Sequence, residues 1–251
     1  MISHSTAIEA TGLTVAYDNQ LIINEINLRI KNGDITIILG GSGCGKSTLL
    51  KSLIGLIPYS KGNLNLLGFD MRKIDEKNQR DLSLKVGMMF QFGALLNSLT
   101  IAENIALPLE IHTDLNKTVI EDIVRYRLDS VSLLDAYNRK PDQLSGGMRK
   151  RAALARAMVM EPEILLCDEP VAGLDPTTAA EIDELMLKIN QQSGTTLVIV
   201  THDLLSIQRI NGDLVMLDAG RILFQGSHDK ALQSDDSKIY SFFHPGNRPY
   251  A

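Results

Sequence analysis

The stretch GGSGCGKST, residues 40–48, is the feature that most constrains how this chain can fold. It follows the apolar run ITIIL (35–39) and precedes a leucine-rich pattern of helical spacing (46–54). Glycines at these positions let the backbone wrap an anion closely, and the N–H groups of the following helix point at it. The arrangement fits G-x-x-x-x-G-K-[ST] between a strand and a helix. We therefore predict a phosphate-binding loop formed by Gly40, Gly41, Ser42, Gly43, Cys44, Gly45, Lys46, Ser47 and Thr48.

The chemistry of this loop predicts ATP and Mg²⁺ as cofactors. Lys46 would reach the β- and γ-phosphates, and the Ser47 hydroxyl would ligate Mg²⁺. A second apolar run, ILLC (164–167), ends in Asp168 and Glu169. Parallel strands present such carboxylates at the edge where α/β folds bind ligands, so Asp168 is expected to hold Mg²⁺ and Glu169 to polarise the attacking water. The alternatives are a glycine-rich turn with an exposed lysine and a solvated acidic turn.

A third apolar run, LVIV (197–200), leads into Thr201-His202-Asp203. At a strand's carboxyl end, His202 is placed to contact the γ-phosphate, although a lone histidine is more often structural. Runs that are apolar on both faces suit the centre of a parallel sheet covered by helices. By contrast, Ile26, Leu28 and Ile30 alternate with polar residues, which is typical of a half-buried antiparallel strand.

Composition limits the class of protein but does not identify it. The chain has 251 residues, a net charge of −5 and two cysteines, which suits a reducing compartment and argues against a nucleic-acid partner. It contains no run long enough to span a bilayer and no signal-peptide pattern at its start. We predict an α/β fold in one domain (1–251). The nucleotide-binding core takes 1–91 and 161–226, a helical subdomain is inserted at 92–160, and a tail follows at 227–251.

The motifs occur in the order shown by the ATP-binding subunits of ABC transporters, and the chain resembles that family over nearly its whole length. The motifs that carry the resemblance are Tyr17, the phosphate-binding loop, Gln91, LSGGM (144–148), Asp168-Glu169, Gly173-Leu174-Asp175 and His202. The resemblance implies a P-loop NTPase (RecA-like) core with an N-terminal antiparallel β subdomain. It also implies that Tyr17 stacks on adenine, that Gln91 contacts Mg²⁺ or the attacking water, and that Asp175 belongs to the nucleotide site. Without the surrounding motifs, Gln91 would be an unremarkable loop residue.

The sequence LSGGMRKRAALARA (144–157) places three cations where a helix begins, although a helix N-terminus is already positive. The resemblance implies a head-to-tail homodimer in which Ser145, Gly146 and Gly147 contact a γ-phosphate bound to the other subunit. Arg149 would add to that positive field. The remaining two cations, Lys150 and Arg151, are expected to be solvated.

The signature LSGGM-x-[KR]-R-[AV]-A-[LI]-A-R-A and the stretch 88–109 resemble the ATPases of Mce-associated lipid transporters, including the Mla-type phospholipid system. The implied function is phospholipid movement between bacterial inner and outer membranes. Implied partners are polytopic permease subunits, an Mce-domain lipid-binding protein and an accessory subunit, at the cytoplasmic face of the inner membrane. The alternatives are an amino-acid-type importer and a soluble, non-transport ABC protein.

Two further segments are singled out by their apolar residues. Those between Phe92 and Ile101 are expected mostly in the core of the helical subdomain, with some lining a groove for a permease helix. The aromatic tail from Tyr240 to Ala251 has no helical pattern and is expected to pack on the second ATPase subunit.

Overall fold

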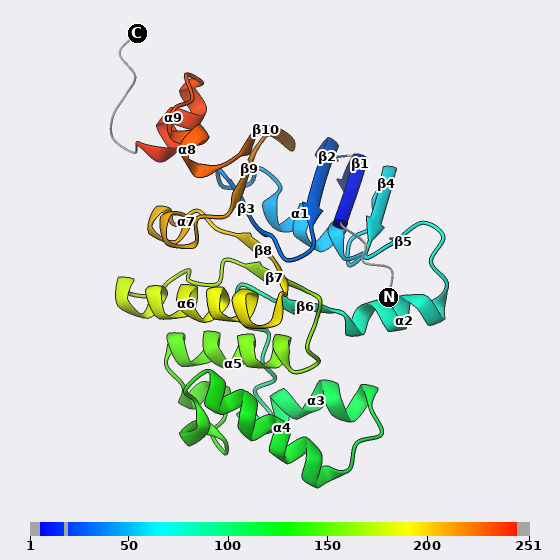
Figure 1. The fold of residues 1–251 in the computed structure, drawn as a ribbon, viewed down its shortest axis with the longest axis vertical. Coiled ribbons are helices and arrows are strands. Elements are labelled where there is room, and N and C mark those ends of the chain that lie inside the picture. The colour runs from blue at the N-terminus through cyan, green and yellow to red at the C-terminus, as the bar shows by residue number, and fades with distance from the viewer. Residues whose placement is uncertain (1–5, 18–19, 245–251) are drawn as a thin grey trace.

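The computed structural model describes residues 6–17 and 20–244, arranged as two sheets with helices around them (Figure 1). Among these residues, the larger sheet has the spatial order β10-β9-β3-β8-β7-β6. Its strands are β3 (Ile35–Gly40), β6 (Val86–Met89), β7 (Ile164–Asp168), β8 (Thr196–Val200), β9 (Asp213–Asp218) and β10 (Arg221–Gly226). The three apolar runs of the sequence thus lie side by side as parallel neighbours. The predicted parallel core is confirmed.

The smaller sheet is antiparallel, as predicted, with the order β2-β1-β4-β5. Its strands are β1 (Thr6–Tyr17), β2 (Gln20–Lys31), β4 (Lys61–Leu66) and β5 (Phe69–Asp70). The alternation in β2 places Ile26, Leu28 and Ile30 in the core while Asn27 and Arg29 remain exposed. This face packs with α1 (Lys46–Leu53) against one side of the larger sheet, where Ile38 belongs to the shared core.

The other side of the larger sheet is covered by helices (Figure 1). Ile37 and Leu39 of β3 point into this second core, together with Leu154 of α5 (Gly146–Met158) and Ile182 of α6 (Pro176–Ser193). The short helices α7 (Leu204–Ile210), α8 (His228–Leu232) and α9 (Ser237–Phe243) add to it. Alternate residues of one strand therefore serve opposite cores, as expected for a strand buried on both faces.

A third core lies at the far end of the molecule, where α3 (Ile101–His112) and α4 (Lys117–Ser130) pack on α5 (Figure 1). A capping box between Thr100 and Glu103 starts α3. The short helices η1 (Leu134–Ala136) and η2 (Pro141–Gln143) return the chain to α5, and α2 (Glu76–Leu84) precedes β6. No helix among the described residues is long and apolar enough to cross a membrane.

Two local expectations were wrong. The stretch VIEDIVRYRLDSVSLL (119–134) has the apolar spacing of one helix, but α4 stops at Ser130 and Ser132 adopts a left-handed φ of 56°. The tail does contain a helix, α9, whose N-cap is Asp236; the Asp236 side chain accepts hydrogen bonds from the N–H groups of Lys238 and Ile239. So short a helix depends on tertiary packing rather than on periodicity. Residues 245–251 of the expected tail lie outside the described residues.

Candidate active site

The loop at 40–48 joins β3 to α1, and its backbone is fixed by the neighbouring strand β9. Gly40 has a φ of 142°, and a Cβ at this position would lie 2.2 Å from the backbone O of Leu217. The N–H of Gly220 also donates to the backbone O of Cys44. Gly40 is therefore required both for its conformation and for the space it leaves.

Lys46 lies at the first residue of α1 and folds back over the loop. Its Nζ donates to the backbone O of Gly40 at 2.8 Å and of Gly41 at 2.9 Å. An ammonium held by two carbonyl groups is poised at the position where anionic phosphates would meet the loop. Cys44 lies beneath it, and burial raises the pKa of its thiol.

Ser47 and Asp168 bring together two oxygen ligands of the kind that Mg²⁺ prefers. Ser47 Oγ donates to Asp168 Oδ1 at 2.9 Å, although the residues are far apart in sequence. Asp168 ends β7 and is 3% exposed. No group of three or more acidic, histidine or cysteine side chains in the described ranges could hold a metal alone. The donors that are present, one hydroxyl and one carboxylate, fit Mg²⁺, which is commonly held by one or two carboxylates together with substrate phosphates and water.

Glu169 adopts a backbone conformation that few residues other than glycine adopt. Its φ is 49°, and the following Pro170 further restricts its backbone. The Glu169 N–H donates to the backbone O of Val200 at 2.9 Å, which ties the residue to the end of β8. Strained backbone held in place by its surroundings is a feature of functional sites.

The carboxylate of Glu169 pairs with His202. His202 Nδ1 lies 2.8 Å from Glu169 Oε1, so the ring donates its Nδ1 hydrogen to the carboxylate. The His202 side chain is 67% exposed and that of Glu169 is 11% exposed, which places the imidazole at the rim and the carboxylate inside. Glu169 Oε2 accepts no hydrogen bond from the described residues, so it remains able to take a proton from water.

A cavity of about 700 Å³ collects most of the predicted site residues. It is lined by Ile22, Gly40, Gly41, Ser42, Gly43, Gly45, Lys46, Ser47, Thr48, Gln91, Glu169, His202 and Phe242. Sequence reasoning missed Ile22 and Phe242. An alternating strand position gives no sign of the first, whereas the aromatic cluster of the tail was a usable signal for the second.

Other predicted residues lie away from this cavity. Within the described ranges, its lining includes neither Tyr17, which is 45% exposed, nor the signature residues Ser145, Gly146 and Gly147. Asp175 caps α6 by accepting hydrogen bonds from Thr177 and Thr178, and the bond from the Thr178 side chain lowers the pKa of its carboxyl.

The signature forms the start of α5, as the loop-to-helix pattern indicated. Ser145 is the N-cap and accepts a hydrogen bond from the N–H of Met148. Gly147 is buried, and a Cβ there would lie 2.4 Å from Thr178 Cγ2 of α6. The second glycine therefore also permits close packing of the two helices, apart from any role at a phosphate.

The expectation that Lys150 and Arg151 are solvated was wrong. Lys150 is 8% exposed and donates to the backbone O of Gln91 and of Glu169. Arg151 pairs with Glu181 of α6 and donates to the backbone O of Val131. Both side chains thus contact segments outside α5, whereas Arg149 remains exposed. A charge count at a helix start cannot reveal such contacts.

The segment after Gln91 divides between core and surface. Ile101 is fully buried, but Phe92 is 90% exposed and Leu96 is exposed as well. The expectation that most of this segment is core was therefore wrong for these two side chains. Phe92 and Leu95 line a cavity of about 470 Å³ that also contacts Gln91, Gly146 and Arg149. This cavity joins the Gln91 loop to the start of α5.

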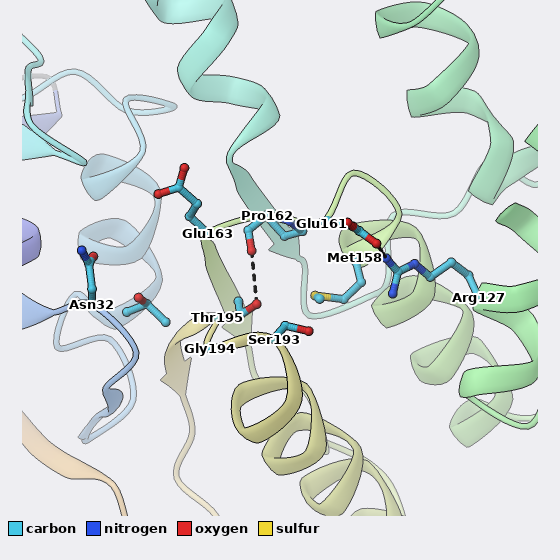
Figure 2. A pocket seen from close by; sticks show the side chains of 10 residues that line it. Asn32, Arg127, Met158, Glu161, Pro162, Glu163, Ser193, Gly194 and Thr195 are labelled. Carbon is cyan, nitrogen blue, oxygen red and sulfur yellow. Dashed lines mark hydrogen bonds and ion pairs between the residues drawn. The ribbon is translucent and has the colours of Figure 1, made fainter. Parts of the chain in front are cut away.

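A further cavity, of about 490 Å³, lies at the opposite edge of the parallel sheet. Figure 2 shows its lining near the starts of β7 and β8, with Thr195 donating to the backbone O of Pro162 and Arg127 paired with Glu161. Ligands of open α/β sheets bind at the carboxyl ends of the strands. Position at the carboxyl ends of the strands therefore favours the cavity at the phosphate-binding loop as the candidate nucleotide site.

A phosphate-binding loop set against the carboxyl ends of a parallel sheet defines a P-loop NTPase. Similarity to known proteins narrows this class. The family model described as ABC transporter matches residues 23–172. The chain is 38% identical over 236 residues to a probable ribonucleotide transport ATP-binding protein of Mycobacterium leprae, covering 94% of this chain and 68% of that one. It spans 66% of the corresponding Mycobacterium bovis protein.

Two other relatives and one solved structure also match this chain over most of its length. The intermembrane phospholipid transport system ATP-binding protein MlaF of Haemophilus influenzae is 34% identical, with 94% of this chain and 89% of MlaF covered. The methionine import ATP-binding protein MetN of Clostridium acetobutylicum is 38% identical, covering 92% and 72%. A dimeric ATP-binding cassette bound to ADP and Pi superposes with a TM-score of 0.81 at 30% identity, covering 88% of this chain and 98% of that one. The chain belongs to the ABC transporter family, as an ATPase subunit.

Proposed function

We propose that this subunit hydrolyses ATP to move phospholipid between the bacterial inner and outer membranes. The observation that carries the cargo assignment is the similarity to MlaF, which extends over 89% of that relative's length. The signature at 144–157, which resembles that of ATPases of Mce-associated lipid transporters, also supports a lipid cargo. The subunit would act as a homodimer at the cytoplasmic face of the inner membrane, beneath polytopic permease subunits, with an Mce-domain protein and an accessory subunit as further partners.

The geometry supports separate roles for the residues at the phosphate-binding loop. Lys46, released from the carbonyls of Gly40 and Gly41, would bind the β- and γ-phosphates. Ser47 and Asp168 would hold Mg²⁺, which supplies charge neutralisation at the phosphate oxygens when bound. Gln91 lines the same cavity and would orient water or contact the metal.

Glu169 is proposed as the general base. Its Oε1 is engaged by His202, which leaves Oε2 to accept the proton of the attacking water. His202, at the rim of the cavity, would contact the γ-phosphate through Nε2. The signature residues Ser145, Gly146 and Gly147 would complete the site of the other subunit, because the start of α5 lies outside the cavity of its own subunit.

The change Glu169→Gln tests this assignment. Positioned base catalysis contributes about 10²–10⁴-fold, so the variant should bind ATP normally and hydrolyse it at least roughly a hundredfold more slowly. The matched control is Glu163→Gln, which alters an exposed glutamate paired with Lys85 and should keep the wild-type rate. A folded Glu169→Gln protein with full ATPase activity would refute the role of Glu169.

A small-solute importer is the second candidate, favoured by the 38% identity to MetN. Affinity purification of the tagged chain from native membranes in mild detergent, followed by mass spectrometry, separates the two. A polytopic permease with an Mce-domain protein supports lipid transport. A solute permease with a small-molecule-binding protein would overturn the cargo assignment, and ribosomal or DNA-repair partners alone would overturn transport itself.

A further inference from the structure

Lys150 contacts two loops whose side chains line the candidate nucleotide cavity. It lies on α5, and its Nζ is 2.5 Å from the backbone O of Gln91 and 2.9 Å from the backbone O of Glu169. The first oxygen belongs to the loop after β6, and the second follows the end of β7. One ammonium group thus bridges two loops that both contribute side chains to the cavity.

The burial of this lysine requires a reason. An ammonium taken out of water loses hydration, and a well-packed apolar residue of similar size is often as favourable at such a position. Burial does lower the pKa of Lys150, while the charges of Glu169 and Asp168 oppose that shift. The ammonium donates to two carbonyl groups, and the negative charges of Glu169 and Asp168 act on it. The buried ammonium is therefore stabilised by the two loops in the conformation that turns their carbonyl groups toward it.

The backbone of Glu169 is where this contact matters most. The residue is left-handed, and contacts from three elements hold it: its N–H donates to Val200 in β8, its carboxylate accepts from His202, and its carbonyl accepts from Lys150. Of these, the contact from Lys150 comes from the helix that also carries the signature. Arg156, further along α5, donates to the carbonyls of Gly93 and Ala94, so the helix and the loop after Gln91 are already joined.

We propose that Lys150 is a positioning residue that holds Gln91 and Glu169 in register with α5. This inference rests on the proposed role of Glu169 as general base. Because Ser145, the N-cap of α5, would contact the nucleotide of the second subunit, the position of Glu169 in one site depends on the signature contact made at the other. Lys150 thereby links the two ATP sites of the dimer without contacting nucleotide.

The test is the change Lys150→Met in the full-length chain, with ATPase kinetics and fluorescent ATP binding as readouts. Misplacement of a catalytic group by about 1 Å can cost a hundredfold, so kcat should fall roughly ten- to a hundredfold. KM for ATP should stay within about twofold, because the phosphate-binding loop is untouched. Lys150→Arg keeps two or more donors in reach of both carbonyls and should restore much of kcat.

Arg151→Met is the matched control on the same helix. It removes the ion pair with Glu181, so it should lower thermal stability and leave kcat unchanged. A wild-type kcat in folded Lys150→Met, or an equal loss of kcat in Arg151→Met, would overturn the proposal. If Lys150→Met does not fold, Lys150→Gln takes its place, and there too a wild-type kcat overturns the proposal while a reduced kcat with normal ATP binding supports it.

A double-variant cycle separates this inference from the function on which it rests. In single-turnover hydrolysis, Lys150→Met should cost much less in the Glu169→Gln background than in the wild type, because the part of its effect that acts through Glu169 is already lost and only the part that acts through Gln91 remains. Fully multiplicative losses would overturn the positioning role. A Glu169→Gln variant with the wild-type rate would instead refute the proposed general base, irrespective of Lys150.

Discussion

The buried pair of Asp183 on α6 and Arg209 on α7 offers a stability test with a clear electrostatic origin. Asp183 Oδ2 accepts from Arg209 Nη1 at 2.6 Å and from Ser206 Oγ at 2.8 Å. The Asp183 side chain is 1% exposed, and its Oδ1 has no partner in the described part of the chain. The pair fixes α7, which begins directly after His202 and Asp203, so it supports the rim of the catalytic cavity.

Arg209→Met would leave the carboxylate of Asp183 buried with only Ser206 as a partner. Removing one member of a buried ion pair costs about 3–5 kcal/mol. The Arg209 side chain is 30% exposed and is partly screened by water, which reduces the expected cost to about 2–3 kcal/mol. For a domain of this size, each kcal/mol lowers Tm by about 2–4 °C, so Tm should fall by about 4–12 °C.

The loss should depend on pH. Burial raises the pKa of Asp183 even with Ser206 and Arg209 in place, and removing Arg209 would raise that pKa further. A carboxyl group whose pKa is higher in the folded state contributes stability below its unfolded pKa and loses it as pH rises through the folded pKa. Protonation of Asp183 in acid therefore removes the unpaired buried charge of the variant. The loss in free energy of unfolding relative to the wild type should be larger at pH 7.5 than at pH 5.

Urea unfolding of the wild type and the variant at both pH values measures this deficit. Lys85→Met is the control, because it breaks the exposed pair with Glu163 and should cost less than about 1 kcal/mol. A deficit below about 0.5 kcal/mol in Arg209→Met, or one that grows on acidification, would refute the reasoning.

Three further predictions concern the nucleotide cavity. Gly40→Ala should lower Tm and ATP affinity, because its Cβ would meet the backbone O of Leu217, whereas Gly41→Ala, which meets no atom within 4 Å, should leave Tm near the wild-type value in the same thermal scan. A bulky thiol reagent should label Cys44 slowly at neutral pH and faster as pH rises, since burial raises its pKa; Cys167, with a pKa raised to about 12, should stay unlabelled in the folded protein. Labelling should abolish ATP binding, and undiminished binding after mass spectrometry confirms modification of Cys44 would count against the loop assignment. Truncation after residue 239 removes Phe242 from the cavity lining and should weaken ATP affinity and dimerisation, as measured by nucleotide titration and sedimentation; unchanged values would exclude a role for the tail.

The parallel core could be predicted because its signals are local. Each central strand is an apolar run, and each ends in a residue type with evident chemistry, such as Asp168 after ILLC. Since carboxyl ends of parallel strands meet at one edge, sequence alone brings the loop at 40–48, Glu169 and His202 to the same place. Their lining of one cavity agrees with that reasoning.

Element ends and short helices could not be predicted in the same way. α4 stops at Ser130 although its apolar pattern runs on, and the left-handed Ser132 lies between two buried residues, Val131 and Leu133. α9 is held by the cap at Asp236, by the ion pair of Lys238 with Asp218 and by burial of Ile239. These contacts join residues from different elements, so no periodicity within the helix announces them.

Lys150 shows why charge patterns alone mislead at a site like this one. Three successive cations at a helix start suggest solvent or an approaching anion, because the dipole disfavours them there. In the fold, however, only Arg149 remains exposed, and the dipole's penalty on Lys150 is offset by the carbonyls of Gln91 and Glu169. Those acceptors come from loops at the ends of β6 and β7, and the second belongs to the left-handed Glu169. The contact between Lys150 and Glu169 therefore joins two distant segments, so the environment of neither residue could be predicted from its own stretch of sequence.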